Sequence, residues 1–169
     1  MIRNALLAPR MRDSGMLRRA APASLIRPVP MDREHPCELC HSQGGILLWR
    51  SDLCRIVLVD DPDYSGFCRV ILEKHVKEMT DLAPAERTRL MEAVFATEAA
   101  LRALLRPDKI NLASLGNVTS HLHWHVIARY RDDRHFPGPI WAEPSRDPVP
   151  ARTPPDCSGL ERLLKAHLG

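Results

Sequence analysis

Three histidines occupy alternate positions in one short segment, His121-Leu122-His123-Trp124-His125-Val126-Ile127. Side chains alternate between the two faces of a β-strand, so residues two apart share a face. A strand here would carry all three imidazoles on one face and present the intervening apolar side chains to a hydrophobic core. Imidazole titrates near neutral pH, and three such groups together are difficult to justify by packing alone. The spacing therefore predicts a functional site.

Two kinds of chemistry suit these histidines. They can bind a catalytic metal ion, as paired histidines on one strand do. Alternatively, one neutral imidazole is a nucleophile and its neighbours orient it and handle charge. The preceding segment, Gly116-Asn117-Val118-Thr119-Ser120, offers an amide, two hydroxyls and backbone N–H groups, which are donors suited to a phosphate. No acidic residue lies close in the sequence to complete a metal shell, although a distant one could fold in.

Apolar runs bounded by turn-forming residues predict the strands that position this segment. We expect strands at residues 46–49, 54–59, 67–72, 109–115 and 121–130. The order predicts an α+β fold with a mainly antiparallel sheet of about five strands.

The clearest helix covers about residues 84–105. Pro84 suits a first helical turn, and Pro107 lies just beyond the end. A short second helix is expected at residues 160–168. The apolar residues that share one face of the long helix at helical spacing are Leu90, Val94, Leu101, Leu104 and Leu105.

Length and composition predict one domain with tails. The 169 residues carry a net charge of only +3, much of it in the first thirty residues, so we expect no nucleic-acid partner. No apolar run approaches the roughly 20 residues of a membrane helix, so we expect no membrane partner. Five cysteines argue against a disulfide framework and favour the cytoplasm. We divide the chain into a disordered extension (1–30), a folded domain (31–142) and a proline-rich arm with a short helix (143–169).

The histidine segment closely resembles the signature of the histidine triad (HIT) family, His-φ-His-φ-His-φ-φ, where φ is apolar. Gly116-Asn117 resembles the Gly-Gln that precedes it in that family, with Asn replacing Gln. Residues 70–75 resemble a strand that ends in Pro-Lys-x-His, although Glu73 stands near the proline position. Leu58-Val59-Asp60 resembles the segment that holds the ribose. The resemblance covers about residues 37–129.

This resemblance implies a homodimeric α+β protein with a HIT-like fold that hydrolyses or transfers nucleotides at the α-phosphate. His123 matches the nucleophile, and the substrate would be a purine nucleotide such as a nucleoside phosphoramidate or dinucleoside polyphosphate. A covalent nucleotidyl-His123 intermediate would form without a cofactor. A backbone carbonyl should accept a hydrogen bond from the other ring nitrogen and fix the tautomer.

The remaining site residues follow from the same resemblance. His121 and His125 would hydrogen-bond phosphate oxygens. Asn117 and backbone donors near Thr119 would stabilise charge on phosphorus, although Asn reaches one methylene less than Gln. Asp60 would accept from the ribose hydroxyls, with Asp61 as the alternative.

Cys37-x-x-Cys40 has the spacing of half a metal site. Some HIT proteins complete such a site with two histidines, here His75 and His121, and the resulting set would suit a structural tetrahedral zinc. Two alternatives stay open: the cysteines are reduced surface thiols, or His35 or His41 competes as a ligand.

Two other functions stay open as well. The chain could be a nucleotide-binding regulatory protein with little turnover, or a metal-dependent hydrolase that uses the three histidines as ligands. Outside the site, we place Cys54 and Cys68 in the core and His135 and His167 at the surface. Trp141 is expected near either the nucleotide or a partner subunit.

Overall fold

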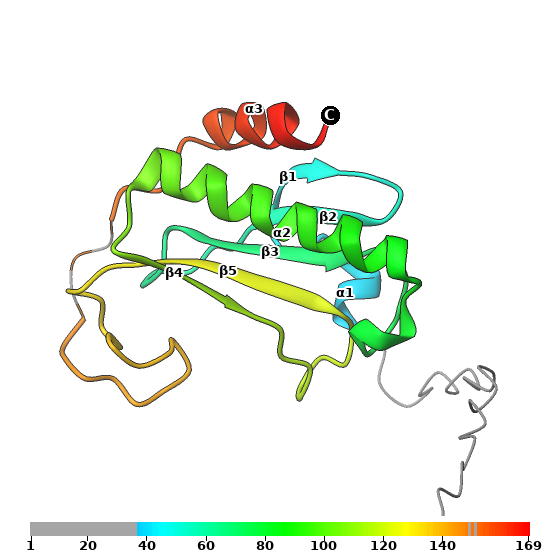
Figure 1. Ribbon diagram of the computed structural model, residues 1–169. Helices are drawn as coiled ribbons and strands as arrows, with labels where there is room; N and C mark the ends of the chain where they lie inside the picture. Colours follow the sequence, from blue (N-terminus) through cyan, green and yellow to red (C-terminus); the bar gives the residue numbers. More distant parts are fainter. Residues whose placement is uncertain (1–36, 149, 151) are drawn as a thin grey trace, which may run out of the picture. The chain divides into compact units, whose positions relative to one another are not determined.

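The computed structural model describes residues 37–148, 150 and 152–169, so the predicted extension at 1–30 lies outside the described residues (Figure 1). Short strands lie before and after one long helix in the chain, as the sequence predicted. In chain order they are α1 (Glu38–His41), β1 (Ile46–Arg50), β2 (Cys54–Leu58), β3 (Phe67–Leu72), the 3-10 turn η1 (Met79–Asp81), α2 (Pro84–Leu105), β4 (Lys109–Ala113), β5 (His123–Arg129) and α3 (Cys157–Leu168).

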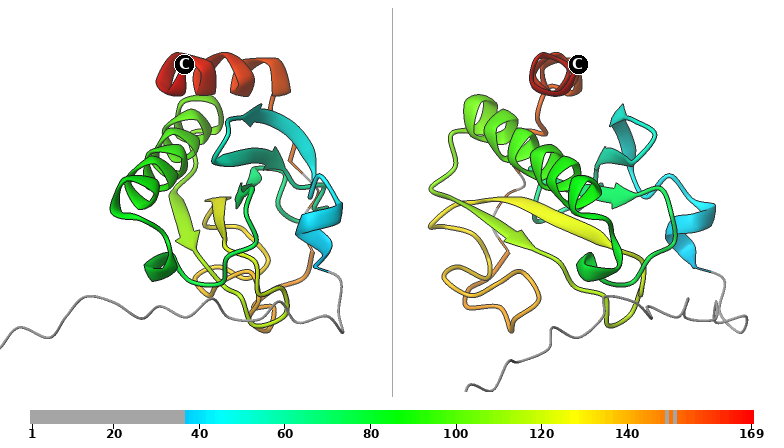
Figure 2. Two further views of the ribbon diagram at one scale, coloured as in Figure 1. Left: turned by 90° about the vertical axis from the view of Figure 1, so that its right-hand side faces the viewer. Right: turned by 45° about the vertical axis from the view of Figure 1, so that its right-hand side comes forward.

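The five strands form one antiparallel sheet in the order β1-β2-β3-β5-β4. The expected α+β class with a mainly antiparallel sheet is therefore confirmed. Strand β5, which carries two of the three histidines, is inserted between β3 and β4. Helix α2 packs across one face of the sheet, whereas the segment after β5 lies on the opposite side (Figure 2).

Alternation along the strands gives the sheet two chemically different faces. Apolar side chains such as Ile56, Val70 and Val126 point toward α2 and form the main core. The other face carries two histidines and three arginines that are buried or half-buried. We call it the histidine face, and these side chains are Arg55, Arg69, His123, His125 and Arg129.

Local signals at both ends explain the bounds of α2. Pro84 occupies the first turn, and the Glu86 carboxylate accepts a hydrogen bond from the Ala83 N–H at 3.0 Å. The helix ends at Arg106, whose φ of 46° is left-handed, and Pro107 follows. In the last turn, Leu104 is 40% exposed and lies beside Gly159 of α3, whereas Leu105 packs against the main core.

Helix α3 is longer than predicted and packs against both α2 and β1. It begins at Cys157, three residues before the predicted start at Leu160, because the Asp156 carboxylate caps the N–H groups of Ser158 and Gly159. Leu160 and Leu164 join the main core. The proline-rich arm thus returns the chain to the folded domain.

The described cysteines are all free, and two of them are core residues. Cys54 and Cys68 are 1% and 0% exposed, as predicted. Burial raises their pKa values to about 11 and about 12, so both remain thiols. Of the helices in the described part of the chain, none combines the length and apolar composition needed to cross a membrane.

Candidate functional site

His123, the predicted nucleophile, is the first residue of β5 and is 7% exposed. Its Nδ1 lies 2.6 Å from the carbonyl oxygen of His121. A carbonyl only accepts, so the proton is on Nδ1 and the Nε2 lone pair is free. Burial lowers the pKa of His123 below its ordinary value, against the opposing effect of this hydrogen bond. The ring is therefore neutral at pH 7 and has an unprotonated nitrogen.

His125 lies beside His123 on the same face, with the two ring centroids 4.7 Å apart. Phe67 and Trp141 enclose its ring at centroid distances of 5.4 and 5.0 Å. Burial, followed by the charges of His123 and Arg69, lowers the pKa of His125 to about 4. Its Nδ1 is shielded from solvent and has no hydrogen-bond partner among the described residues. The hydrogen-bonding capacity of this nitrogen is thus unmet.

His121 does not share the face of the other two histidines, so the expectation of three imidazoles on one strand face is wrong. Strand β5 begins two residues later, which leaves the ring of His121 free to turn away. Its Nε2 donates to the carbonyl of Leu72 at 2.7 Å, and its bare Nδ1 lies 3.4 Å from the sulfur atoms of both Cys37 and Cys40. The ring is 1% exposed.

His121 belongs instead to a group that we call the Cys–His cluster, formed by Cys37, Cys40, His75 and His121. One candidate ligand atom from each residue lies within 4.8 Å of all the others, and the Cys40 sulfur is 3.3 Å from His75 Nδ1. In tetrahedral zinc sites, ordinary bond lengths place sulfur and nitrogen ligands about 3.6 Å apart. The observed separations of 3.3 and 3.4 Å are close to this value. The donor set and its geometry therefore fit zinc.

Of the two competing ligands, His41 is the one within the described residues, and it is not part of this cluster. His41 lies in α1 next to Cys40 but is absent from the group, and His35 lies outside the described residues. Burial and the neighbouring Cys37 raise the pKa of Cys40. Two thiolates this close repel each other, and a divalent cation would offset that repulsion.

Arg55 holds the segment that carries the two cysteines against the sheet. Its guanidinium is 3% exposed and donates to the carbonyls of Leu39, Ser42 and Gln43 at 2.6, 3.0 and 3.1 Å. It also pairs with Glu73 at 3.2 Å. Sequence reasoning did not single out this residue, although a lone arginine inside an apolar strand was an available signal.

The connection between β4 and β5 carries the predicted phosphate donors. Asn117 is exposed and Thr119 is half-buried in the bend that leads to the histidines. At the start of this connection, the Ser114 hydroxyl donates to the carbonyl of His123 at 2.9 Å. No hydrogen bond within the described residues joins Asn117 to His123, so its approach to the reacting phosphate stays a prediction.

The two candidate ribose ligands differ in what their carboxylates do. Asp61 accepts from the backbone N–H groups of Asp63 and Tyr64 at 2.9 and 3.0 Å, so it shapes the turn after β2. Asp60 is exposed. A carboxylate engaged in a turn has less capacity for a ligand, which favours Asp60 of the two.

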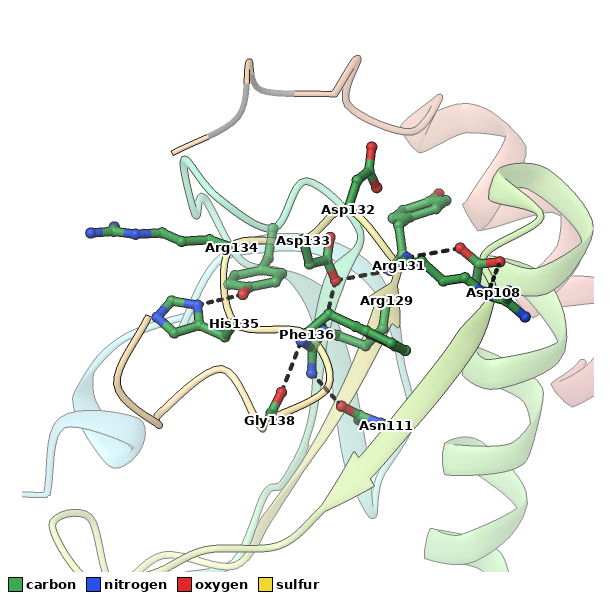
Figure 3. Close-up of polar contacts among 12 residues, drawn as sticks. Asp108, Asn111, Arg129, Arg131, Asp132, Asp133, Arg134, His135, Phe136 and Gly138 are labelled. Carbon is green, nitrogen blue, oxygen red and sulfur yellow. Dashed lines mark hydrogen bonds and ion pairs between the residues drawn. The ribbon is translucent and has the colours of Figure 1, made fainter. Parts of the chain in front are cut away.

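A hydrogen-bonded network fixes the segment after β5 against the histidine face (Figure 3). Arg129 is 1% exposed and donates to Asp133 at 2.8 Å, to Asn111 at 2.6 Å and to the Gly138 carbonyl at 3.0 Å. The same segment brings Trp141 against His125. Trp141 therefore lies at the histidine site of its own chain.

The surface position predicted for His135 is wrong. Its ring is 9% exposed, and Nδ1 lies 2.6 Å from the hydroxyl of Tyr64 (Figure 3). The partner is 71 residues away in the chain, so no local pattern indicates the contact. His167, in contrast, is exposed as expected.

Comparison with known proteins identifies the same fold. The HIT domain family model matches residues 43–132, which is just over half of the chain. A histidine triad protein from Bradyrhizobium japonicum is 25% identical, with a TM-score of 0.59 over 75% of this chain and 92% of the other. A HIT protein from Sinorhizobium meliloti is 26% identical, with a TM-score of 0.58 over 74% and 90% of the two chains. No curated protein matches this chain.

The family match covers β1 to β5 and includes both histidines of the histidine face. Membership supports a role in nucleotide binding, hydrolysis or transfer. The chain belongs to the histidine triad family.

Proposed function

We propose that this protein is a nucleotide hydrolase or nucleotidyl transferase that acts through His123 at the α-phosphate of a nucleoside phosphoramidate or dinucleoside polyphosphate. The observation that carries the proposal is the 2.6 Å contact from His123 Nδ1 to the His121 carbonyl. With the proton on Nδ1, the Nε2 lone pair is free, which supports the proposal that Nε2 is the nucleophile. Imidazole is a nucleophile at neutral pH only in its neutral form, and the lowered pKa supports this form.

The chemistry proceeds in two displacements. The Nε2 lone pair forms a bond to the α-phosphorus, and the bond from phosphorus to the leaving group breaks. The bonding electron pair goes with the leaving group, either to an amine that takes up a proton from solvent or to a phosphate that leaves as an anion. The imidazole is then a cation, and the His121 carbonyl stabilises the positive charge at Nδ1. Water or another acceptor next attacks phosphorus, restores the neutral ring and releases the nucleotide.

The surrounding groups would bind the substrate in this scheme. We assign His125 to a phosphate oxygen because its ring adjoins that of His123. Asn117 and the backbone near Thr119 would donate to the phosphoryl group, and Asp60 would accept from the ribose hydroxyls of a purine nucleotide. We assign His121 to the Cys–His cluster and not to phosphate, since its ring nitrogens face Leu72 and the two sulfur atoms.

We also propose that the Cys–His cluster binds a structural zinc. When bound, the metal would crosslink the segment before β1 to the segment before β5. Only His121 among the three triad histidines belongs to this cluster. This separation argues against a metal-dependent hydrolase that uses all three as ligands.

A homodimer and a cytoplasmic location remain our proposals. Strand β4 is an edge of the sheet, and an edge presents unpaired backbone groups to another chain. The five free cysteines suit a reducing compartment. Light scattering on the full chain would measure the oligomeric state, and a monomer at micromolar concentration would contradict the first proposal.

The test of the activity is release of AMP from adenosine 5′-phosphoramidate and diadenosine polyphosphates. We expect His123→Ala to abolish release, whereas the matched variant His167→Ala, at an exposed histidine on α3, retains it. Intact-mass measurement on rapidly quenched enzyme should detect a nucleotidyl adduct that His123→Ala lacks. Unchanged activity in His123→Ala would refute the nucleophile. Tight nucleotide binding without turnover or adduct would favour a regulatory protein instead.

A further inference from the structure

The histidine face carries three buried or half-buried arginines, and they differ in how their guanidinium groups are satisfied. Arg55 donates to three carbonyls and pairs with Glu73. Arg129 donates to Asp133, Asn111 and the Gly138 carbonyl. Arg69 is the exception, because its Nε is shielded from solvent and has no hydrogen-bond partner among the described residues. None of the ion pairs found in the described part of the chain includes Arg69.

Arg69 lies at the centre of the histidine site. In the pairing of β3 with β5 it is directly opposite His125, and the next pair on the same face is Ile71 with His123. Directly paired residues have Cβ atoms about 5 Å apart, so the Arg69 side chain leaves the sheet beside the imidazole of His125. Its guanidinium carbon is 5.4 Å from the centre of the Phe67 ring, which also adjoins His125.

A half-buried cation with an unmet donor is costly for a protein that only has to fold. Burial lowers the pKa of Arg69, while Glu38 and Asp61 raise it, yet a guanidinium remains charged at any working pH. The Asp61 carboxylate already accepts two backbone hydrogen bonds. Desolvating a donor without a partner costs about 1–3 kcal/mol, and more for a charged group. A packing role alone would be served better by an apolar side chain.

We propose that the Arg69 guanidinium binds a phosphoryl oxygen of the substrate beside His125 and so selects 5′-phosphorylated nucleosides over uncharged ones. This inference rests on the proposed function. A guanidinium presents a planar fork of N–H donors that matches two oxygens of one phosphoryl group. Phosphate is the anionic part of a nucleotide, and an anion at the terminal N–H groups of Arg69 would balance its buried charge. Because Asn117 is shorter than the family's glutamine, a second donor to the phosphoryl group would be useful. Arg69 provides one from β3, the strand paired with β5.

The test compares the dissociation constants of 5′-AMP and adenosine by isothermal titration calorimetry, which requires no turnover. The variants are Arg69→Met, which keeps the apolar stem, and Arg69→Gln, which keeps a polar end. Arg102→Met is the matched control, because Arg102 is an exposed arginine on α2. We expect both Arg69 variants to bind 5′-AMP about 10- to 100-fold more weakly and adenosine with unchanged affinity. The control should match the wild-type protein for both ligands.

Three results would overturn the inference. The first is an equal loss for 5′-AMP and adenosine, which would indicate a packing role. The second is unchanged 5′-AMP affinity in a variant with a wild-type near-ultraviolet circular dichroism spectrum. The third needs no variant: wild-type protein that binds adenosine as tightly as 5′-AMP. Failure of the proposed function gives a different pattern, in which 5′-AMP binding depends on Arg69 but no phosphoramidate is cleaved.

Discussion

The buried imidazole of His125 should make the folding stability of this protein fall in a defined acidic range. Burial first, then His123 and Arg69, lowers its pKa from 6.5 to about 4. A difference of this size between the unfolded and folded chain corresponds to about 3 kcal/mol. The folded-state pKa is the lower one, so the unfolded chain takes up the proton first as pH falls. The stability is therefore fully present above about pH 6.5 and is lost progressively between about pH 6.5 and 4.

The measurement is urea unfolding of the wild-type protein and of His125→Asn at several pH values from about 7.5 to 4. Other groups titrate in both proteins, so the informative quantity is the difference between their free energies of unfolding. We expect this difference to change by about 2 kcal/mol by pH 5 and about 3 kcal/mol by pH 4, with the variant losing less stability. Proton NMR of the His125 ring gives the pKa directly. A midpoint near 6.5, or parallel stability curves, would refute the reasoning.

Three further predictions concern the supports of the site. Purified protein should contain about one zinc per chain, measured by elemental analysis, and a metal-free wild-type protein would contradict the assignment. Cys40→Ser or a strong chelator should remove the zinc and lower the melting temperature in calorimetry, whereas Cys157→Ser should do neither. Arg55→Met should cost about 3–5 kcal/mol of unfolding free energy, because it leaves three backbone carbonyls without their donor and Glu73 paired with Arg50 alone. A cost below about 1 kcal/mol in urea unfolding would contradict this. Leu164→Ala should lower the free energy of unfolding by about 2–5 kcal/mol, because it leaves a cavity between α3 and α2. Nucleotide affinity should not change, and reduced affinity would show that α3 reaches the site.

Much of the fold follows from signals that act within a few residues. Apolar runs between turn formers predicted all five strands, and helical spacing between Pro84 and Pro107 predicted α2 with the observed bounds. These predictions succeed because the periodicity of strands and helices is a local property of the sequence, and burial of the apolar face stabilises the element directly. Helix α3 was predicted too short because Gly159 weakens a helical pattern, whereas the Asp156 cap stabilises the first turn.

The site was predictable only where its residues share one segment. The alternation of His123 and His125 on one face followed from strand geometry. The turn of His121 toward Cys37 did not, because the contact joins residues 84 apart in the chain. The family resemblance suggested that contact, but periodicity could not. The role proposed for Arg69 also depends on strand pairing, since only the register places it opposite His125.

His121 contributes its ring to the Cys–His cluster and its backbone carbonyl to the nucleophile. These two parts of one residue lie only a few bonds apart, and the hydrogen bond from Nε2 to the Leu72 carbonyl holds the ring in one orientation. The spacing between the cluster and the nucleophile is therefore set locally, by this residue and its hydrogen bonds, more than by how well the core packs. Substitutions in the core can lower the stability of this protein considerably before they alter the alignment of His123. We expect engineered variants to tolerate repacking under α2 far better than a one-residue insertion between His121 and His123.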